Sequence, residues 1–220
     1  MKKQKISDAV IHRLPRYYRY LDDLYNKGVV RISSHSLGDK MDITASQIRQ
    51  DLSCFGEFGQ QGYGYNVEYL FEEIGKILGL NTIQNMIIIG AGNLGQALAN
   101  YDFDRIGFKV IGIFDANPRL EGLAVHGIEI KMVDEVEEFI KTHEIHVATL
   151  TVPKKNARTI ASQLEEWGIR AIWNFAPTDL HVSDDVCVKN VHLDESLMTL
   201  SYNFRNRGKE KYSYHSYMDD

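Results

Sequence analysis

The sequence has few cysteines, few prolines and no long apolar run. Its 220 residues include 2 Cys and 4 Pro, and apolar runs such as residues 86–89 fall far short of the roughly 18 to 20 residues that cross a bilayer. The lysine-rich start has no apolar stretch behind it, so neither membrane association nor a signal peptide is expected. Cys54 and Cys187 stand far apart without metal-ligand spacing, which predicts a reduced, cytoplasmic protein without disulfides.

The sequence also lacks a strong net charge, and its formal value of −5 argues at first sight against nucleic acid. The charge is unevenly spread, however. Residues 1–50 hold ten basic and five acidic residues, whereas the rest of the chain holds 15 and 25. A basic segment ahead of an acidic one predicts two modules with different partners, and the basic module is the one suited to phosphate.

The first 54 residues have the pattern of short amphipathic helices. Apolar residues recur at helical spacing over residues 7–25, where Pro15 is expected to kink the helix, and Gly28 is expected to end it. A short helix follows Ser33 or Ser34. Thr44 and Gln47 then match a capping box that starts a third helix. This order predicts a helix-turn-helix, whose polar outer face would read base edges or hold phosphates through Ser46, Gln47, Arg49, Gln50 and Ser53. Gln47 carries a conflict, because a capping-box side chain folded onto the backbone is less free to reach DNA.

Glycines and aromatics alternate over residues 55–67, which predicts a hairpin or wing rather than more helix. A further amphipathic helix is expected over residues 66–80. We therefore assign residues 1–80 to a winged-helix DNA-binding domain. The alternative for this segment is a small helical bundle used for packing only.

A glycine-rich turn begins the second module. An apolar strand at residues 86–89 is followed by a G-x-G-x-x-G turn and a helix, and the next strand, at residues 109–114, ends in Asp115, 20 residues after Gly95. This arrangement is typical of a dinucleotide-binding βαβ unit, in which the turn receives the pyrophosphate and the acid binds the ribose. Asp115 would repel a 2′-phosphate, which favours NAD over NADP. The expected turn residues are Gly90, Ala91, Gly92, Asn93, Leu94 and Gly95.

Strands and helices continue to alternate, with strands at 146–151, 171–175 and 186–191 and a helix at 156–167. The class is α/β, and residues 81–194 are expected to form a doubly wound parallel-sheet Rossmann domain. Cofactors in such sheets lie at the carboxyl ends of the strands. Two loops at these ends are therefore candidate cofactor sites: Thr151, Val152 and Pro153, and Asn174, Phe175 and Ala176.

The last segment, residues 195–220, is expected to be a C-terminal helix and a mobile, Tyr-rich tail. Leu197, Leu200 and Phe204 form an apolar stripe with no later element to cover it.

These features together resemble the Rex family of redox-sensing transcriptional repressors over essentially the whole chain. The segments that carry the resemblance are residues 13–15, 18–21, 46–53, 55–56, 62–67, 90–95, 150–153 and 174–177. The resemblance implies a homodimer, with the C-terminal helix exchanged between subunits, that binds an inverted-repeat operator in double-stranded DNA. It also implies that NADH weakens DNA binding, so that the protein reports the balance of NADH and NAD+.

The resemblance also assigns roles to single residues. It places Ser46 and Arg49 in the major groove and the wing in the minor groove, where Gln60, Gln61, Tyr63 and Tyr65 are the candidates. Tyr101 is similar to a Tyr near the nicotinamide that is coupled to an Arg, matched here by Arg19. The sequence departs from the family at three places. Gln60 and Gln61 replace a basic pair, Cys54 replaces an aromatic, and His192 stands where an Asp completes the switch, with Asp194 a substitute.

Two other functions stay open. A true NAD-dependent dehydrogenase would need a proton donor such as His181 or Lys154, yet nothing outside the nucleotide fold looks like a substrate domain. We therefore expect no catalytic residue and no enzyme. A helix-turn-helix regulator that senses another nucleotide, such as coenzyme A, is the second alternative. His143 and His146 span a loop-to-strand junction, so no metal site is expected, and Cys54 has no basic activator nearby in the sequence.

Overall fold

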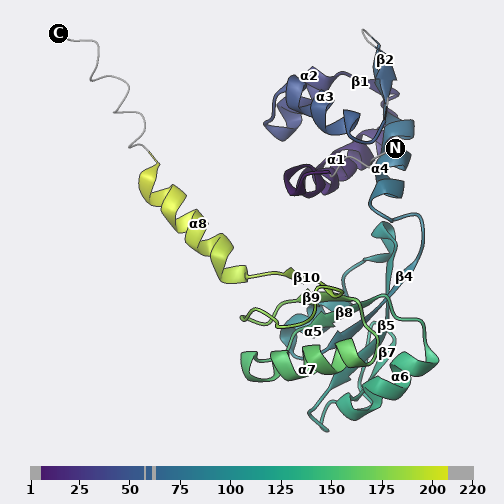
Figure 1. Cartoon of the computed structure of the whole chain (residues 1–220), viewed down its shortest axis with the longest axis vertical. Helices are drawn as coiled ribbons and strands as arrows, with labels where there is room; N and C mark the ends of the chain where they lie inside the picture. The colour runs from purple at the N-terminus through teal and green to yellow at the C-terminus, as the bar shows by residue number, and fades with distance from the viewer. Residues whose placement is uncertain (1–5, 57, 61–62, 208–220) are drawn as a thin grey trace, which may run out of the picture. The chain divides into compact units, whose positions relative to one another are not determined.

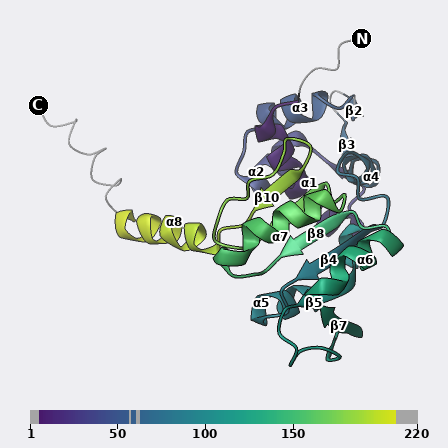
Figure 2. The same cartoon turned by 60° about the horizontal axis from the view of Figure 1, so that its bottom comes forward.

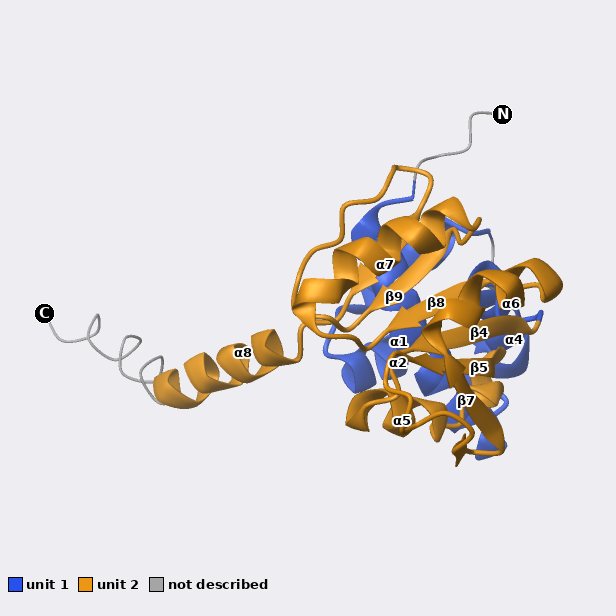
Figure 3. Cartoon of the chain, turned by 90° about the horizontal axis from the view of Figure 1, so that it is seen from below, with its two compact units in different colours: residues 1–82 blue, residues 83–220 orange. Residues whose placement is uncertain are grey.

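The computed structural model describes residues 6–56, 58–60 and 63–207. The chain divides into two compact units, Met1–Thr82 and Ile83–Asp220, which are coloured separately in Figure 3. Each unit has its own apolar core. No helix in the described ranges is long and apolar enough to cross a membrane.

The first unit consists of four helices and a small sheet (Figure 1). Its elements are α1 (Asp8–Asn26), β1 (Arg31–Ile32), α2 (Ser34–Met41), α3 (Ala45–Ser53), β2 (Gly59–Gln60), β3 (Gly64–Asn66) and α4 (Val67–Ile77). The sheet has the order β1-β3-β2, and both pairs are antiparallel. The predicted winged helix-turn-helix is thus present, with α2 and α3 as its two short helices and β2 and β3 as its wing.

Helix starts in the first unit follow the sequence signals closely. The side chains of Ser33, Thr44 and Asn66 accept hydrogen bonds from the backbone N–H groups of Ser36, Gln47 and Tyr69, which are otherwise unpaired at a helix start. Pro15 lies inside α1, which continues past it to Asn26. The inward faces of all four helices meet in one core that includes the fully buried Leu21, Leu37, Ile48 and Leu70.

The second unit is a seven-stranded sheet with helices on both faces (Figures 1 and 2). Its elements are β4 (Gln84–Ile89), α5 (Asn93–Ala99), a 3-10 turn η1 (Asp104–Ile106), β5 (Phe108–Asp115), β6 (Ala124–Val125), β7 (Ile128–Met132), a 3-10 turn η2 (Val133–Glu135), α6 (Val136–Thr142), β8 (Val147–Leu150), α7 (Lys154–Glu166), β9 (Ala171–Asn174), β10 (Cys187–Asn190) and α8 (Leu193–Asn206).

The strand order β10-β9-β8-β4-β5-β7-β6 changes direction at β4. All neighbours are parallel except β6 and β7, so the sheet is parallel with one antiparallel edge strand. This is the Rossmann order, in which the crevice beside the first strand is the usual ligand site. The elements β6, β7, η2 and α6, which lie between β5 and β8, were not among the predicted elements.

The side chains of β4 point alternately to the two faces of the sheet, and helices cover both faces. Ile87 and Ile89 pack in one core with residues of α6 and α7, whereas Ile88 packs on the other face with Ala99 of α5. Successive side chains of a strand point to opposite faces, so an unbroken apolar run is what a sheet covered on both sides requires. The carboxyl end of β4 therefore emerges between layers of helix, where the glycine turn begins.

Candidate functional site

Helix α3 presents a polar outer face. Ser46, Arg49, Gln50 and Ser53 are all exposed, while Ile48 on the opposite side is fully buried. The Arg49 guanidinium donates a hydrogen bond to Ser34 Oγ at 3.0 Å, which links α3 to the first turn of α2. The side chain of Ser53 donates to the Gln50 carbonyl oxygen at 2.8 Å. The structure thus gathers these four predicted residues on one surface, with guanidinium, amide and hydroxyl groups side by side.

Gln47 lies at the border between the outer and inner faces of α3. Its backbone N–H completes the Thr44 cap, but its side-chain amide turns toward Asp51 and donates to Oδ1 at 2.7 Å. The expected capping-box contact from the Gln47 side chain is thus replaced by a contact one turn further along α3. The structure therefore removes the conflict, because this side chain is not folded back on its own helix start.

Asp51 was not among the predicted site residues, yet its carboxylate accepts four hydrogen bonds from side chains of the first unit. Its carboxylate is fully buried and accepts two hydrogen bonds from Arg13, at 2.6 and 2.8 Å, and one from the Tyr17 hydroxyl at 2.8 Å, besides that from Gln47. Burial alone would raise the pKa of Asp51, but the hydrogen bonds outweigh it and hold that pKa below its ordinary value. The pair Arg13 and Asp51 thus fastens α3 to α1.

The wing is held against β1 by Arg31, which was not among the predicted site residues. The exposed guanidinium of Arg31 donates to the Tyr63 carbonyl oxygen at 3.2 Å and lies 6.0 Å from the centre of the Tyr63 ring. Tyr63 is 68% exposed, whereas Tyr65 is half-buried. Gln60 lies in β2, and Gln61 lies outside the described residues. A signal for Arg31 was available in hindsight, since it is the only basic residue between Gly28 and Lys40 in the sequence.

The glycine turn after β4 is closely packed against Thr151 at the end of β8. Gly90 has a φ of +103°, and a Cβ there would lie 2.7 Å from the Thr151 carbonyl oxygen. A Cβ on Gly95 would overlap the Gly90 carbonyl oxygen. A Cβ on Gly92, by contrast, would meet no atom within 4 Å. The first and last glycines are therefore required by the fold, whereas the middle one leaves open space above the backbone.

Asp115 ends β5 beside this turn. Its Oδ2 accepts a hydrogen bond from the Ala91 backbone N–H at 2.6 Å, and its Oδ1 accepts one from the Asn117 N–H at 2.7 Å. Each carboxylate oxygen can accept more than one hydrogen bond. The backbone thus fixes the carboxylate at the mouth of the crevice and leaves acceptor capacity on both oxygens.

A cavity of about 500 Å³ opens between the glycine turn and the loop after β8. It contains six of the predicted cofactor residues: Gly90, Gly92, Asp115, Thr151, Val152 and Pro153. Its floor and walls add apolar and amide groups that sequence reasoning missed, namely Leu120, Val133 and Ile160 with Asn117 and Asn156. Those residues come from loops and helices after three different strands, which short-range sequence patterns do not connect. Its size suits part of a dinucleotide, because ligand pockets span roughly 300 to 1,000 Å³.

The remaining predicted cofactor residues lie outside this cavity's lining. Ala91 lies in the turn, Asn93, Leu94 and Gly95 begin helix α5, and Ala176 is buried. Asn174 is also fully buried, and its amide donates to the Thr178 carbonyl oxygen and to Asn190 Oδ1, both at 2.8 Å. That side chain therefore shapes the loop after β9 rather than facing a ligand.

A row of four aromatic rings joins the segment between α5 and η1 to the end of β9. The rings of Tyr101 and Phe103, Phe103 and Trp173, and Trp173 and Phe175 have centres 4.7, 5.7 and 4.6 Å apart. Tyr101 is 64% exposed, and Phe175 is half-buried. The predicted switch partner Arg19 belongs to the first unit, where its guanidinium lies 5.8 Å from the Tyr20 ring.

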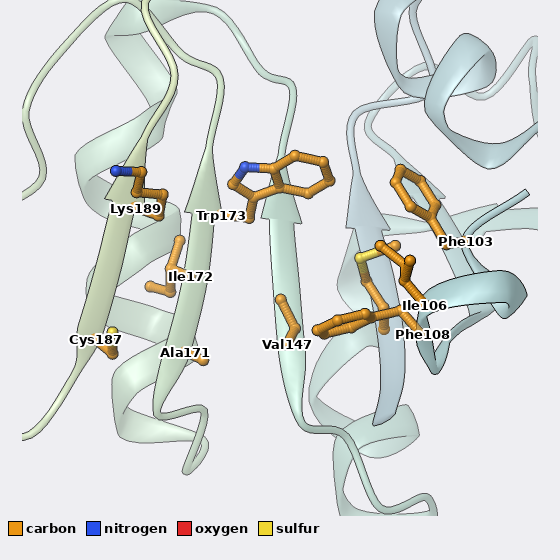
Figure 4. A pocket seen from close by; sticks show the side chains of 10 residues that line it. Phe103, Ile106, Phe108, Val147, Ala171, Ile172, Trp173, Cys187 and Lys189 are labelled. Atoms are coloured by element: carbon orange, nitrogen blue, oxygen red, sulfur yellow. The ribbon is translucent and has the colours of Figure 1, made fainter. Parts of the chain in front are cut away.

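Trp173 and Phe103 also border a second cavity, of about 300 Å³, on the α5 side of the sheet (Figure 4). Figure 4 shows the side chains of Val147, Trp173 and Lys189 along strands β8, β9 and β10, opposite Ile106 of η1 and Phe103 just before it. The lining is almost wholly apolar.

Helix α8 carries the apolar stripe predicted for the tail. None of its residues is buried, and Leu197, Leu200 and Phe204 are 67%, 62% and 75% exposed. His192 caps its start, with Nε2 3.8 Å from Asp179 Oδ1, and Asp194 lies exposed in the first turn. The tail beyond residue 207 lies outside the described residues. Cys54 and Cys187 are free and exposed, and the described ranges contain no group of three metal-ligating side chains.

Family models match both units. Residues 5–53 match a model described as a putative DNA-binding protein N-terminus, and residues 81–178 match a CoA binding domain. The Rossmann-type and DNA-binding parts of the chain are thus recognised independently of each other.

Whole-chain relatives agree with this division. The redox-sensing transcriptional repressor Rex of Clostridium perfringens strain SM101 is 56% identical over 91% of this chain and 95% of its own length, and that of Thermoanaerobacter pseudethanolicus is 57% identical over 91% and 90%.

Solved structures of RSP, a Rex-family repressor, superpose closely. The complex of RSP with β-NAD+ and operator DNA gives a TM-score of 0.88 at 53% identity, covering 98% of this chain and 100% of RSP. The complex with β-NADH gives 0.87 at 52% identity, covering 94% and 98%. With this identity over nearly its whole length, the chain belongs to the Rex family of redox-sensing transcriptional repressors.

Proposed function

We propose that this protein is a transcriptional repressor that binds an inverted-repeat DNA operator and leaves it when NADH binds. The observation that carries the proposal is the presence, in one chain, of an exposed polar helix α3 within a winged helix-turn-helix and a glycine turn closed by Asp115. The first is suited to DNA, and the second to a dinucleotide. Complexes of RSP with β-NAD+, operator DNA and β-NADH support both halves.

The residues of the 500 Å³ cavity fit an adenine dinucleotide. Asp115 would accept hydrogen bonds from the ribose hydroxyls, and the open backbone at Gly92 would admit the pyrophosphate. Leu120, Val133 and Ile160 offer an apolar slot for the adenine ring. A 2′-phosphate would meet the negative charge of Asp115, which favours NADH over NADPH.

Redox sensing requires a different affinity for the two oxidation states of the nicotinamide. The oxidised ring is a cation and the reduced ring is neutral, so a surrounding of aromatic side chains such as Tyr101 and Phe175 favours the reduced form. Arg19 is the candidate partner that couples Tyr101 to the DNA-binding unit. Asp194 and His192 are the two candidates for the third member of this switch.

A homodimer with exchanged C-terminal helices would explain two exposed apolar surfaces at once. Helix α8 leaves Leu197 and Phe204 uncovered, and an apolar cavity of about 300 Å³ opens beside Trp173 in the same unit. In a dimer each surface can be covered by a second copy of the chain. Two copies also match an inverted repeat, whose half-sites are related by the same twofold symmetry.

The proposal assigns no catalytic role to this chain, and the naming of its relatives as transcriptional repressors supports it. A sensor of coenzyme A is the second candidate, favoured by the description of the family model over residues 81–178. Asp115 supports NADH instead, since the adenosine ribose of coenzyme A carries a 3′-phosphate that would face the same carboxylate.

A mobility-shift experiment tests the proposal directly. DNA selected by the protein from a library of inverted repeats is bound to it and titrated with NADH, NAD+ and coenzyme A in separate series. We expect NADH to release the DNA at the lowest concentration. Because coupling between two sites is reciprocal, the DNA must also weaken NADH binding by the same factor, roughly 5- to 150-fold for a coupling of about 1 to 3 kcal/mol. Equal NADH affinity with and without DNA would contradict the switch.

A further inference from the structure

Gln47 is the one outward-reaching side chain of α3 whose orientation is fixed by a buried group. Asp51 lies one turn further along the helix, and its carboxylate is fully buried. An ionised carboxylate accepts hydrogen bonds and cannot donate them. The end of the Gln47 amide that faces Asp51 must therefore be the NH2 group, whichever way the amide would turn in the absence of Asp51.

The rigidity of this contact comes from α1. Arg13 and Tyr17 supply the other three hydrogen bonds to the Asp51 carboxylate, at 2.6 to 2.8 Å. Those donors belong to a helix that is itself anchored in the core through Leu14 and Leu21. Asp51 therefore cannot move with Gln47 if the amide rotates. Rotation would break the hydrogen bond between them, so the amide keeps one orientation.

The rest of the Gln47 amide is available to a partner. One N–H and the carbonyl oxygen Oε1 remain, and within the described part of the chain Oε1 has no hydrogen-bond partner. Gln47 is half-buried, next to the exposed Ser46 and Gln50. The side chain therefore offers one donor and one acceptor, side by side, at the edge of the surface that the proposed function assigns to the major groove.

We infer that Gln47, positioned by Asp51, specifies an adenine in each half-site of the operator. Adenine presents an N6 amino donor and an N7 acceptor in the major groove, which complement the free carbonyl oxygen and N–H of a glutamine amide. Guanine presents two acceptors there, and the carbonyl oxygen of Gln47 would face one of them. Asp51 acts as a positioning residue, since it touches Gln47 and not the base.

This inference rests on the proposed function and deepens it, because it concerns which base pair α3 reads. It also separates Gln47 from Gln50. The side chain of Gln50 is exposed and makes no side-chain hydrogen bond among the described contacts. A glutamine that is free to rotate can present either end of its amide, so it discriminates less between bases than one whose amide is held.

Selection from a random DNA library is the test. Wild-type protein, Gln47→Leu and Gln163→Leu are each used to enrich double-stranded DNA randomised over two half-sites, and the bound fractions are sequenced. Gln47→Leu removes the amide, with both its donor and its acceptor, and leaves the hydrogen bonds of Arg13 and Tyr17 to Asp51 in place. Gln163 is exposed on α7 of the second unit, so Gln163→Leu controls for the substitution itself.

We expect the wild type and Gln163→Leu to select the same inverted repeat, with adenine at one position that Gln47→Leu no longer distinguishes. The loss at that position should be roughly 5- to 150-fold, the factor that corresponds to about 1 to 3 kcal/mol for a bidentate contact. An unchanged profile for Gln47→Leu, or an equal loss at every position, would overturn the inference while the proposed function stands. If the wild type selects no inverted repeat, both fail.

Asp51→Asn tests the positioning role separately. The substitution keeps the size of the side chain but lets either end of residue 51 face Gln47, so the Gln47 amide is no longer held one way round. We expect discrimination to fall at the same base pair and at no other, in protein whose thermal melt still shows a folded first unit. Full discrimination by folded Asp51→Asn would show that Asp51 does not position Gln47.

Discussion

Arg13 and Asp51, 38 residues apart in the sequence, form a two-pronged ion pair with N···O distances of 2.6 and 2.8 Å. The Asp51 side chain has no exposed surface, and that of Arg13 is 23% exposed. Because a buried charge is tolerated only with a partner, this pair makes the placement of α3 depend on α1. The helix that carries the candidate DNA contacts is thus held by a polar bond as well as by its apolar face.

Removing one member of the pair should destabilise the first unit strongly. We expect Asp51→Ala to lower its free energy of unfolding by about 3 kcal/mol, since Arg13 then keeps a partly buried charge without its partner. Urea titration measures the change. Asp23→Ala removes an exposed acid of α1 and serves as the control, with an effect within about 0.5 kcal/mol. In the double variant Arg13→Met with Asp51→Ala, the loss should be smaller than the sum of the single losses.

The ion pair of Arg13 and Asp51 predicts how the free energy of unfolding depends on pH. The pKa of Asp51 is lower in the folded state than its ordinary value of about 3.9. A group of this kind stabilises the folded state above its unfolded pKa and loses that contribution as the pH falls through its folded pKa. The free energy of unfolding of the first unit should therefore fall as the pH drops below about 4. Asp51→Asn should show a shallower fall, and an identical slope in the two proteins would contradict the assignment.

Two glycines of the turn are expected to have different roles, Gly95 in folding and Gly92 in nucleotide binding. A Cβ at Gly95 would overlap the Gly90 carbonyl oxygen and lie 2.9 Å from Thr151 Oγ1, so Gly95→Ala should destabilise the second unit by about 1 to 3 kcal/mol. Gly92 has an ordinary φ of −70° and open space around it, so Gly92→Ala should fold normally. We expect that second variant to lose NADH binding, because its methyl group fills the space proposed for the pyrophosphate. Thermal melts with isothermal titration of NADH distinguish the two effects, and undiminished NADH binding by Gly92→Ala would place the pyrophosphate elsewhere.

Local signals in the sequence predicted much of this protein. The caps at Ser33 and Thr44, the wing and the glycine turn all arise from contacts between residues a few positions apart, and each of these was confirmed. The Rossmann order followed from the regular alternation of strands and helices. The strands β6 and β7 were missed. They form a short antiparallel pair, of two and five residues, that interrupts the regular alternation of parallel strands and helices.

Contacts between distant residues could not be predicted in the same way. Asp51 looked like an ordinary polar residue of an exposed helix, and only the packing of α1 against α3 shows that it is buried with Arg13 and Tyr17. The capping-box assignment for Gln47 was half correct, because a buried carboxylate one turn away competes more strongly for the amide than the helix start does. Arg31 gained its role from the pairing of β1 with β3, which brings the wing beside it.

Arg31 supplies a cation where the wing has Gln60 and Gln61 instead of a basic pair. Its guanidinium donates one N–H to the Tyr63 carbonyl oxygen, and no other hydrogen bond joins it to the described residues. It lies next to the exposed Tyr63 ring. If it contacts a phosphate of the operator, Arg31→Ala should weaken binding to all DNA sequences alike and reduce the slope of log K against log salt by about 0.9. Lys109→Ala removes an exposed positive charge from the second unit and controls for net charge. Fluorescence anisotropy over a salt series measures both slopes. Equal slopes for the wild type and Arg31→Ala would mean that Arg31 only supports the wing. Equal reductions of the slope in Arg31→Ala and Lys109→Ala would mean that the total charge of the protein sets the salt dependence, and not a contact at the wing.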